Sequence, residues 1–176
     1  MSDILERAQS LLAITPDRWR ALATAADPDL IRRAPAPGEW SALECLQHLL
    51  DTEEHVFPVR VRAFLAGEDF PGFDPDQAGT LLGDAVDAAA MVDRFAQARH
   101  ASLDLLAGLV DADLERTAVH ADLGQVTLDE MLHEWVAHDL GHTVQAERAL
   151  MQPFIAGSGP WRSFFTDHDV EAKPRG

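Results

Sequence analysis

The sequence predicts an all-α protein, a four-helix bundle formed by a single domain that spans residues 1–176. Three observations support this prediction. The apolar positions follow helical spacing over four long segments. Strand signals are nearly absent, because β-branched residues never alternate with polar ones over a useful length and the chain has no Tyr. The length is enough for one domain to bury a core without covalent or metal staples.

The first helix is predicted over residues 3–26. Thr15-Pro16 lies in its middle, and Thr followed by Pro is typical of the N-cap and first residue of a helix. The pair therefore suggests two helical pieces in place of one continuous rod. A loop that contains Pro28 and Pro35 follows this helix.

The second helix is predicted over residues 41–66 and has a sharp start. Ser41 and Glu44 have the spacing of a capping box, in which each side chain accepts a hydrogen bond from the backbone N–H of the other residue. Gly67 is the expected residue just beyond the helix end. Residues 68–80, rich in Pro, Gly, Asp and Phe, are predicted to form a long connection.

The third and fourth helices are predicted over residues 81–108 and 127–150. Thr127 and Glu130 repeat the capping-box spacing at the start of the fourth helix. Pro153 lacks a backbone N–H and should end this helix near residue 150. The segment that follows is aromatic, and we expect it to pack back on the bundle through Trp161, Phe164 and Phe165.

Charge and composition limit the partners. The formal net charge of −16 repels phosphate backbones, and no basic stripe is present, so nucleic-acid binding is not expected. No run of about 18 apolar residues exists, and the N-terminus lacks the features of a signal peptide, so no membrane association is expected. A single cysteine, Cys45, suits a reducing compartment, and a cytoplasmic location is expected.

The fourth predicted helix carries two histidines on its inward stripe, where a bundle normally has Leu. The stripe consists of Leu128, Met131, Trp135, His138, His142, Gln145 and Ala149. Because His138 and His142 are four residues apart, their imidazoles lie about 6 Å apart along the axis and face the same point, as in helical metal-binding pairs. Gly141 between them suggests close approach of another helix or a ligand.

A metal site needs a third ligand, and His48 on the second helix is the candidate. His48 lies at the edge of the apolar stripe, and whether it meets the pair depends on helix direction. His55 lies about 10 Å further along the same face, too far to share the ion. His133 points roughly 140° away from His138 and is a poor candidate.

Structural roles also explain several of these residues. A lone inward His is usually a hydrogen-bonded core residue, and two histidines at this spacing also occur by chance. Glu44 is explained by capping, Cys45 by burial as a small apolar thiol, and Trp135 by the core. Asp139 is expected to be a solvated helix charge, with a role in orienting an imidazole as the alternative.

Two segments together resemble the DinB-like (DinB/YfiT) superfamily. Residues 37–68 read PGEWSALECLQHLLDTEEHVFPVRVRAFLAGE, similar to the family's second helix, which has a Trp-Ser start and a metal-ligand His followed by Leu. Residues 127–150 read TLDEMLHEWVAHDLGHTVQAERAL, similar to the last helix with its His-x₃-His motif and a following Gln. The resemblance implies that His48, His138 and His142 bind the metal.

The resemblance also implies the connectivity of the bundle. Members of this superfamily form an up-down-down-up bundle, which agrees with long connections over residues 68–80 and 109–126. Many members have a second His just before the last His of the pair, where this chain has Gly141. That position is not usually a ligand, so the three proposed ligands are unaffected.

Two classes of function follow. Three neutral imidazoles leave coordination positions open, as catalytic sites do, and Zn²⁺ or Ni²⁺ suits imidazole best, with Fe²⁺ also compatible. The resemblance implies a metal-dependent enzyme acting on a small-molecule substrate, either a transferase that uses a low-molecular-weight thiol or a hydrolase. Glu44, Asp51 or Gln145 would then accept a proton or support a ligand. The alternative is a non-enzymatic, metal-stabilised module that binds a ligand or forms a homodimer.

Overall fold

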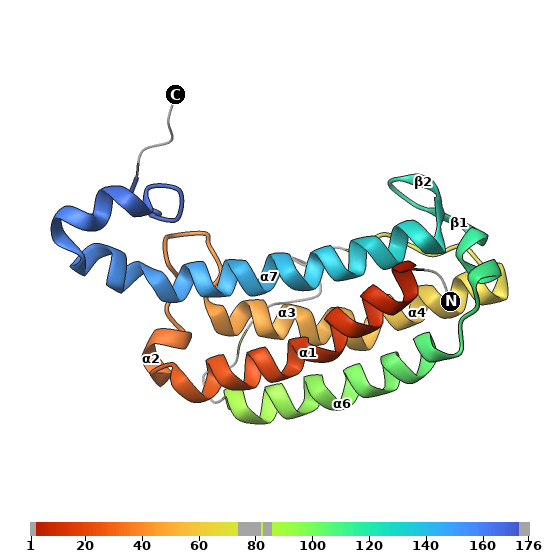
Figure 1. Ribbon diagram of the computed structural model, residues 1–176, viewed down its shortest axis with the longest axis horizontal. Coiled ribbons are helices and arrows are strands. Elements are labelled where there is room, and N and C mark those ends of the chain that lie inside the picture. The colour runs from red at the N-terminus through yellow and green to blue at the C-terminus, as the bar shows by residue number, and fades with distance from the viewer. Residues whose placement is uncertain (1–2, 74–81, 83–85, 173–176) are drawn as a thin grey trace.

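Four long helical segments form a bundle in the computed structural model, which describes residues 3–73, 82 and 86–172 (Figure 1). In chain order they are α1 (Asp3–Ala25), α3 (Ala42–His55) continued by α4 (Phe57–Ala66), α6 (Ala88–Ala107) and α7 (Leu128–Gly157). A single short turn of helix, α2 (Pro28–Ile31), lies between α1 and α3. The all-α four-helix prediction is therefore confirmed.

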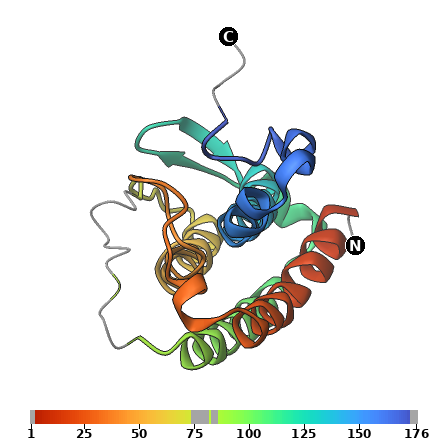
Figure 2. The same ribbon diagram turned by 90° about the vertical axis from the view of Figure 1, so that its left-hand side faces the viewer.

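The connectivity is up-down-down-up. Figure 1 shows α1 and α7 running in one direction, and α3–α4 and α6 running in the other. α1 and α3 each pack against both α6 and α7, and the end-on view in Figure 2 shows this arrangement. Because α4 ends and α6 starts at opposite ends of the bundle, a long connection is required. Most of the predicted connection over 68–80 lies outside the described residues. The predicted helix start at residue 81 is wrong, because α6 begins at Ala88, where the side chain of the N-cap residue Asp87 accepts from the backbone N–H of Ala89.

The core consists of two clusters of buried apolar side chains. The first lies among α1, α4, α6 and α7 and includes Phe57 and Trp135. The second lies towards the other end and includes Trp19, Leu46 and Phe95. Within the described ranges, no helix combines the length and the apolar character that crossing a membrane would require.

Both predicted capping boxes are present. At the start of α3, Ser41 Oγ accepts from the backbone N–H of Glu44, and a Glu44 carboxylate oxygen accepts from the backbone N–H of Ser41 at 2.7 Å. Thr127 and Glu130 make the same reciprocal pair at the start of α7. Since both helices carry the histidines, the caps define where those histidines lie along the bundle.

Replacing Thr127 by Ala is expected to lower the free energy of unfolding by about 1 kcal/mol, because the backbone N–H of Glu130 at the start of α7 loses its side-chain acceptor. Urea denaturation followed by circular dichroism measures the loss. Ser10→Ala, at an exposed position in the middle of α1, is the matched control. It removes a hydroxyl that caps no helix and should leave the free energy of unfolding nearly unchanged. Equal losses in the two variants would contradict the capping role.

Two prolines that were expected to mark helix boundaries lie inside helices. α1 is one continuous helix through Pro16, where the prediction was two pieces. Thr15 does not cap a new helix; its Oγ1 donates to the backbone oxygen of Leu11 one turn earlier. α7 continues past Pro153 to Gly157, because Ile155 is buried and holds the last turn against the protein. At Pro16, the backbone oxygen of Leu12 accepts from Arg99 Nη1 at 2.9 Å in place of the missing N–H. At Pro153, packing outweighs the lost backbone hydrogen bond.

The predicted second helix is divided at Val56, with α3 before it and α4 after it. Val56 has φ −118° and ψ −74°, outside regular helix geometry. The physical cause is Pro58 at the start of α4, because its ring removes one backbone donor and crowds the preceding turn. The division lies between His48 and the residues of α4 that face the same cavity.

A β-hairpin, absent from the prediction, interrupts the connection between α6 and α7. The 3₁₀ turn η1 (Asp111–Glu115) precedes strands β1 (Thr117–His120) and β2 (Gly124–Thr127), which pair antiparallel. Gly124 has φ +77°, a conformation that favours glycine, and it lets the chain enter β2. The strands are four residues each, too short for an alternating pattern to register in the sequence.

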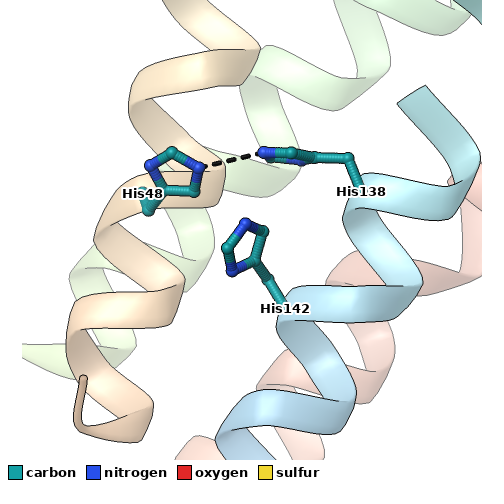
Figure 3. Close-up of side chains that lie close together, drawn as sticks. All are labelled: His48, His138 and His142. Carbon is teal, nitrogen blue, oxygen red and sulfur yellow. Dashed lines mark hydrogen bonds between the residues drawn. The ribbon is translucent and has the colours of Figure 1, made fainter. Parts of the chain in front are cut away.

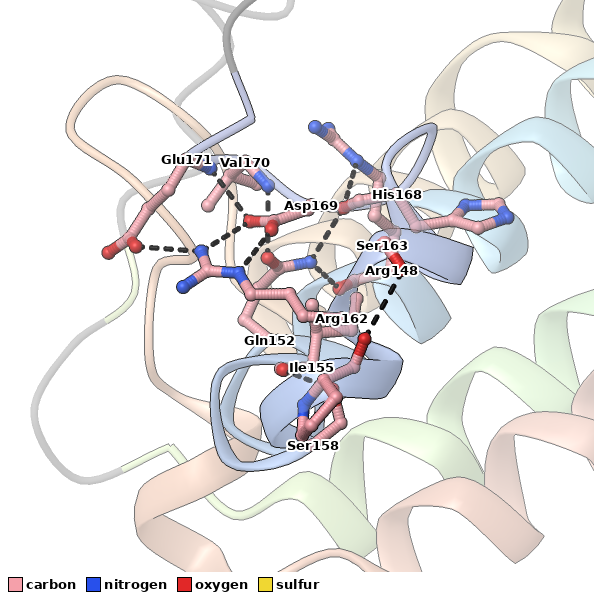
Figure 4. Close-up of polar contacts among 11 residues, drawn as sticks. Arg148, Gln152, Ile155, Ser158, Arg162, Ser163, His168, Asp169, Val170 and Glu171 are labelled. Carbon is pink, nitrogen blue, oxygen red and sulfur yellow. Dashed lines mark hydrogen bonds and ion pairs between the residues drawn. The ribbon is translucent and has the colours of Figure 1, made fainter.

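The C-terminal 3₁₀ segment η2 (Gly159–Phe165) lies against α7, but the expected burial of its aromatic residues is wrong. Trp161 and Phe164 are 65% and 78% exposed, and Phe165 is 38% exposed. Polar contacts hold this end of the chain instead (Figure 4). Arg162 donates to both carboxylate oxygens of Asp169, and Gln152 donates to the backbone oxygen of His168.

Candidate metal centre

His48, His138 and His142 lie together between α3 and α7 (Figure 3). The Nε2 atoms of His48 and His138 are 2.9 Å apart, and one ligand atom from each of the three residues lies within 4.8 Å of the others. The side chains meet because α3 and α7 are antiparallel neighbours. Helix direction, which the sequence left open, therefore brings together the three residues that the sequence singled out.

Aromatic side chains fix the planes of the three imidazoles. The Trp40 ring stacks on His142, with centroids 5.6 Å apart at 21°, and also contacts His48 at 4.9 Å. Phe57 meets His138 edge-on at 5.1 Å. Since rings packed on several sides have few rotamers, the nitrogen atoms are held ready to bind rather than arranged by the ligand.

Gln145 determines the tautomer of His142. The His142 Nδ1 is 2.9 Å from Gln145 Oε1, and because an amide oxygen only accepts, Nδ1 must carry the hydrogen. The lone pair is then on Nε2, which faces the other two rings (Figure 3). Gln145 therefore contacts the proposed metal ligand His142, as expected for the supporting role that the sequence suggested.

Burial keeps the imidazoles neutral. Together with repulsion from the neighbouring His142, it lowers the pKa of His48 to about 4. Burial likewise lowers the pKa of His138 to about 3, with added repulsion from His142 and His48. The pKa of His142 is also lowered by burial, although the bond to Gln145 opposes the shift. Neutral imidazoles with converging lone pairs fit a divalent transition metal such as Zn²⁺ or Ni²⁺.

The other two histidines considered from the sequence lie away from the cluster. His133 is exposed on α7, where its Nδ1 lies 2.9 Å from the backbone oxygen of Asp129. His55 is exposed at the end of α3, with Glu54 as its neighbour. Among the carboxylates proposed for proton transfer, Glu44 caps α3, and Asp51 accepts from Gln47. Neither carboxylate lines the cavity beside the histidines.

Two expectations about α7 are wrong. Asp139 is buried, not solvated, and it accepts a hydrogen bond from Arg99 at 2.7 Å. Arg99 also donates to Glu53 at 2.6 Å, so these three charged side chains form a buried triad. A Cβ added at Gly141 would meet nothing within 4 Å, so close approach of another helix does not explain this glycine, and close approach of a ligand stays a prediction.

A cavity of about 450 Å³ extends from the three histidines along α4 and α7. Its polar lining includes three residues that the sequence analysis missed, Arg60, His120 and Glu134. A signal existed for one of them. Glu134 precedes His138 by one step of four residues, which places it on the same helix face. Arg60 follows His48 by twelve residues, about 120° round a regular helix, so the helical repeat did not indicate it. His120 comes from the hairpin and had no such signal.

Gln145→Leu is expected to weaken metal binding by about 10- to 100-fold, because His142 loses the acceptor that sets its tautomer. Competition titration of zinc against a chromophoric chelator measures the change. Gln97→Leu, an exposed position on α6, is the control and should bind zinc as the parent does. An unchanged affinity for Gln145→Leu would mean that His142 needs no fixed tautomer.

The sequence of this chain matches a known family. The sequence model of the DinB superfamily matches residues 11–146, a span that includes the three histidines and most of the bundle. The chain belongs to the DinB superfamily. A comparison with curated proteins finds no match.

Solved structures of other DinB-like proteins share the fold of this DinB-superfamily chain. YfiT from Bacillus subtilis superposes with a TM-score of 0.74 at 18% identity, over 85% of this chain and 87% of YfiT. YfiT is described as a probable metal-dependent hydrolase with an unusual four-helix bundle topology. The DinB-like protein YjoA from Bacillus subtilis superposes with a TM-score of 0.55 at 19% identity, over 82% of this chain and 90% of YjoA.

Proposed function

We propose that this chain is a metal-dependent enzyme that acts on a small molecule and holds one divalent transition-metal ion through His48, His138 and His142. The observation that carries the proposal is the convergence of three neutral imidazoles at a cavity of about 450 Å³. In the part of the chain that the structure describes, no fourth His, Cys, Asp or Glu joins the cluster. Open coordination positions favour an enzyme over a closed, purely structural site.

The residues around the site have separate tasks. A divalent ion bound here would polarise an electrophile and lower the pKa of a nucleophile such as water or a thiol. The three imidazoles would hold it, and the contact with Gln145 would keep His142 in the required tautomer. Phe57 and Trp40 pack against the imidazoles on the cavity wall and exclude bulk water from that side.

Hydrolysis is the reaction proposed first. YfiT, which shares the fold, is described as a probable metal-dependent hydrolase. Transfer of a low-molecular-weight thiol is the second candidate, because the cavity has room for a thiol beside an electrophile and the same imidazoles serve both reactions. The two reactions differ only in the nucleophile, so one assay run with and without thiol separates them.

Glu134 is the carboxylate best placed to accept a proton. Two glutamates line the cavity, but Glu130 is engaged with Thr127 in the cap of α7. Glu134 lies one helical turn from His138, and partial burial raises its pKa, with Arg60 opposing the shift.

Glu134→Gln is expected to lower turnover by about 10²-fold or more while the bound metal is retained. Loss of metal with the activity would contradict this role.

The test uses full-length protein loaded with Zn²⁺ or Ni²⁺ and a panel of small esters, amides and alkyl halides, each with and without cysteine. We expect turnover that depends on the metal and is lost in His48→Ala. His55→Ala, an exposed position on the same helix, is the control and should keep full activity. Failure to bind about one metal ion per chain, or equal turnover in His48→Ala, would overturn the proposal.

A further inference from the structure

A buried cation, Arg60, lines the same cavity as the three histidines. Arg60 is only 9% exposed, and its guanidinium lies over the Phe70 ring at 5.2 Å. Its one ion-pair contact within the described ranges is long, 4.0 Å from Nη1 to Glu134 Oε2, and the Glu134 side chain is half-exposed. A buried guanidinium normally has a close, hydrogen-bonded carboxylate, as Arg99 has in this protein.

The hydrogen bonds at His120 leave one donor without an acceptor. The His120 Nε2 is 3.2 Å from Arg60 Nη2, which can only donate. The His120 Nδ1 is 3.1 Å from the backbone N–H of Asp122, which also can only donate. A neutral imidazole has one lone pair on its nitrogens and one N–H, so it satisfies one of these donors in either tautomer. A charged imidazole would satisfy neither.

We propose that Arg60 and His120 bind the carboxylate of an organic substrate in this cavity. The carboxylate would accept from the guanidinium and from His120 Nε2–H, while His120 Nδ1 keeps its bond with the Asp122 backbone. The proposal rests on the proposed function for the reaction that follows, but the binding site itself needs no metal. It assigns a role in substrate selection to two residues outside the three-histidine cluster.

The surroundings favour a monoanion with an apolar body. Apart from the histidines, Thr52 and the charged residues, the side chains that line the cavity are apolar, and they include Phe57 and Met131. Glu134 and Glu130 also face this cavity, and the chain carries a net charge of −16, so a doubly charged phosphate would be repelled more strongly than a carboxylate. The substrate class is therefore a carboxylic acid whose apolar chain leads from Arg60 towards the three histidines.

The test measures calorimetric binding of 4-phenylbutyrate and of its neutral amide to full-length protein, first stripped of metal and then loaded with zinc. We expect the stripped protein to bind the carboxylate at least about tenfold more tightly than the amide, because charge-assisted hydrogen bonds form with the carboxylate alone. Arg60→Met should abolish this preference, and Arg60→Lys should retain part of it. Arg62→Met, exposed on the same helix, is the control with the same change of charge.

Three results would overturn the proposal. The first is equal binding of the carboxylate by Arg60→Met and Arg62→Met, with circular dichroism showing both folded. The second is binding that occurs in the zinc-loaded protein alone and is indifferent to Arg60, which would place the carboxylate on the ion. The third is tighter binding of phenyl phosphate than of 4-phenylbutyrate. Because the first titration contains no metal, failure of the metal proposal leaves this test intact.

Discussion

Replacing Arg99 by Met is expected to destabilise the protein by about 3–5 kcal/mol, the largest stability change predicted for this chain. Arg99 is 1% exposed and donates to Glu53 at 2.6 Å, to Asp139 at 2.7 Å and to the backbone oxygen of Leu12 at 2.9 Å. Without the guanidinium, two carboxylates and one carbonyl would remain buried without their donor. Urea denaturation of the metal-free protein measures the loss.

The control is Arg94→Met on the same helix. Arg94 makes a bidentate pair with Glu54, but its side chain is 61% exposed, so the loss should be below about 1 kcal/mol. A triple variant that adds Glu53→Gln and Asp139→Asn to Arg99→Met should recover part of the stability, because the buried charges are then absent. A loss in Arg99→Met no larger than in Arg94→Met would mean that water reaches the triad.

The buried triad of Arg99, Glu53 and Asp139 also lies next to the three-histidine cluster. Asp139 follows His138 directly on α7, and Arg99 contacts the rings of Phe95 and Trp135, one from each core cluster. Arg99 therefore joins the two halves of the core behind the histidine cluster. Its positive charge also contributes to the low pKa of His138, after burial and the two other imidazoles.

Local spacing in the sequence predicted the starts of α3 and α7 and the pairing of two of the three histidines. The capping boxes at Ser41 and Thr127 depend on residues three positions apart, and the structure has both of them. The pairing of His138 with His142 depends on the helical repeat alone. The meeting of these two residues with His48 required helix direction, which followed from the resemblance to the superfamily rather than from spacing.

Long-range packing decided what the sequence could not show. Asp139 resembles a solvated charge because its partner Arg99 lies on another helix, and the charge pattern of α7 does not reveal it. Pro16 remains inside α1 because the surrounding side chains are buried. His120 reaches the cavity on a strand too short to be recognised, so no sequence pattern indicated this residue of the proposed carboxylate site.

Replacing His142 by Ala is expected to reduce the metal content from about one ion per chain to below about a tenth, because two imidazoles from different helices bind a divalent ion far more weakly than three. Elemental analysis after exhaustive dialysis measures the metal content per chain. His133→Ala, exposed on the same helix, should keep the full metal content. Unchanged metal content in His142→Ala would show that the ion is held elsewhere.

The same variant separates a catalytic ion from one needed for folding. The two core clusters do not include His142, so His142→Ala should remain folded and keep an unfolding temperature close to that of the metal-free parent. Added zinc should raise the unfolding temperature of the parent but not of the variant, since a ligand stabilises only the state that binds it. If the metal-free parent were itself unfolded, binding would supply the folding free energy, and the site would be a structural one. A folded, metal-free bundle with its cavity intact would instead agree with an ion held for chemistry.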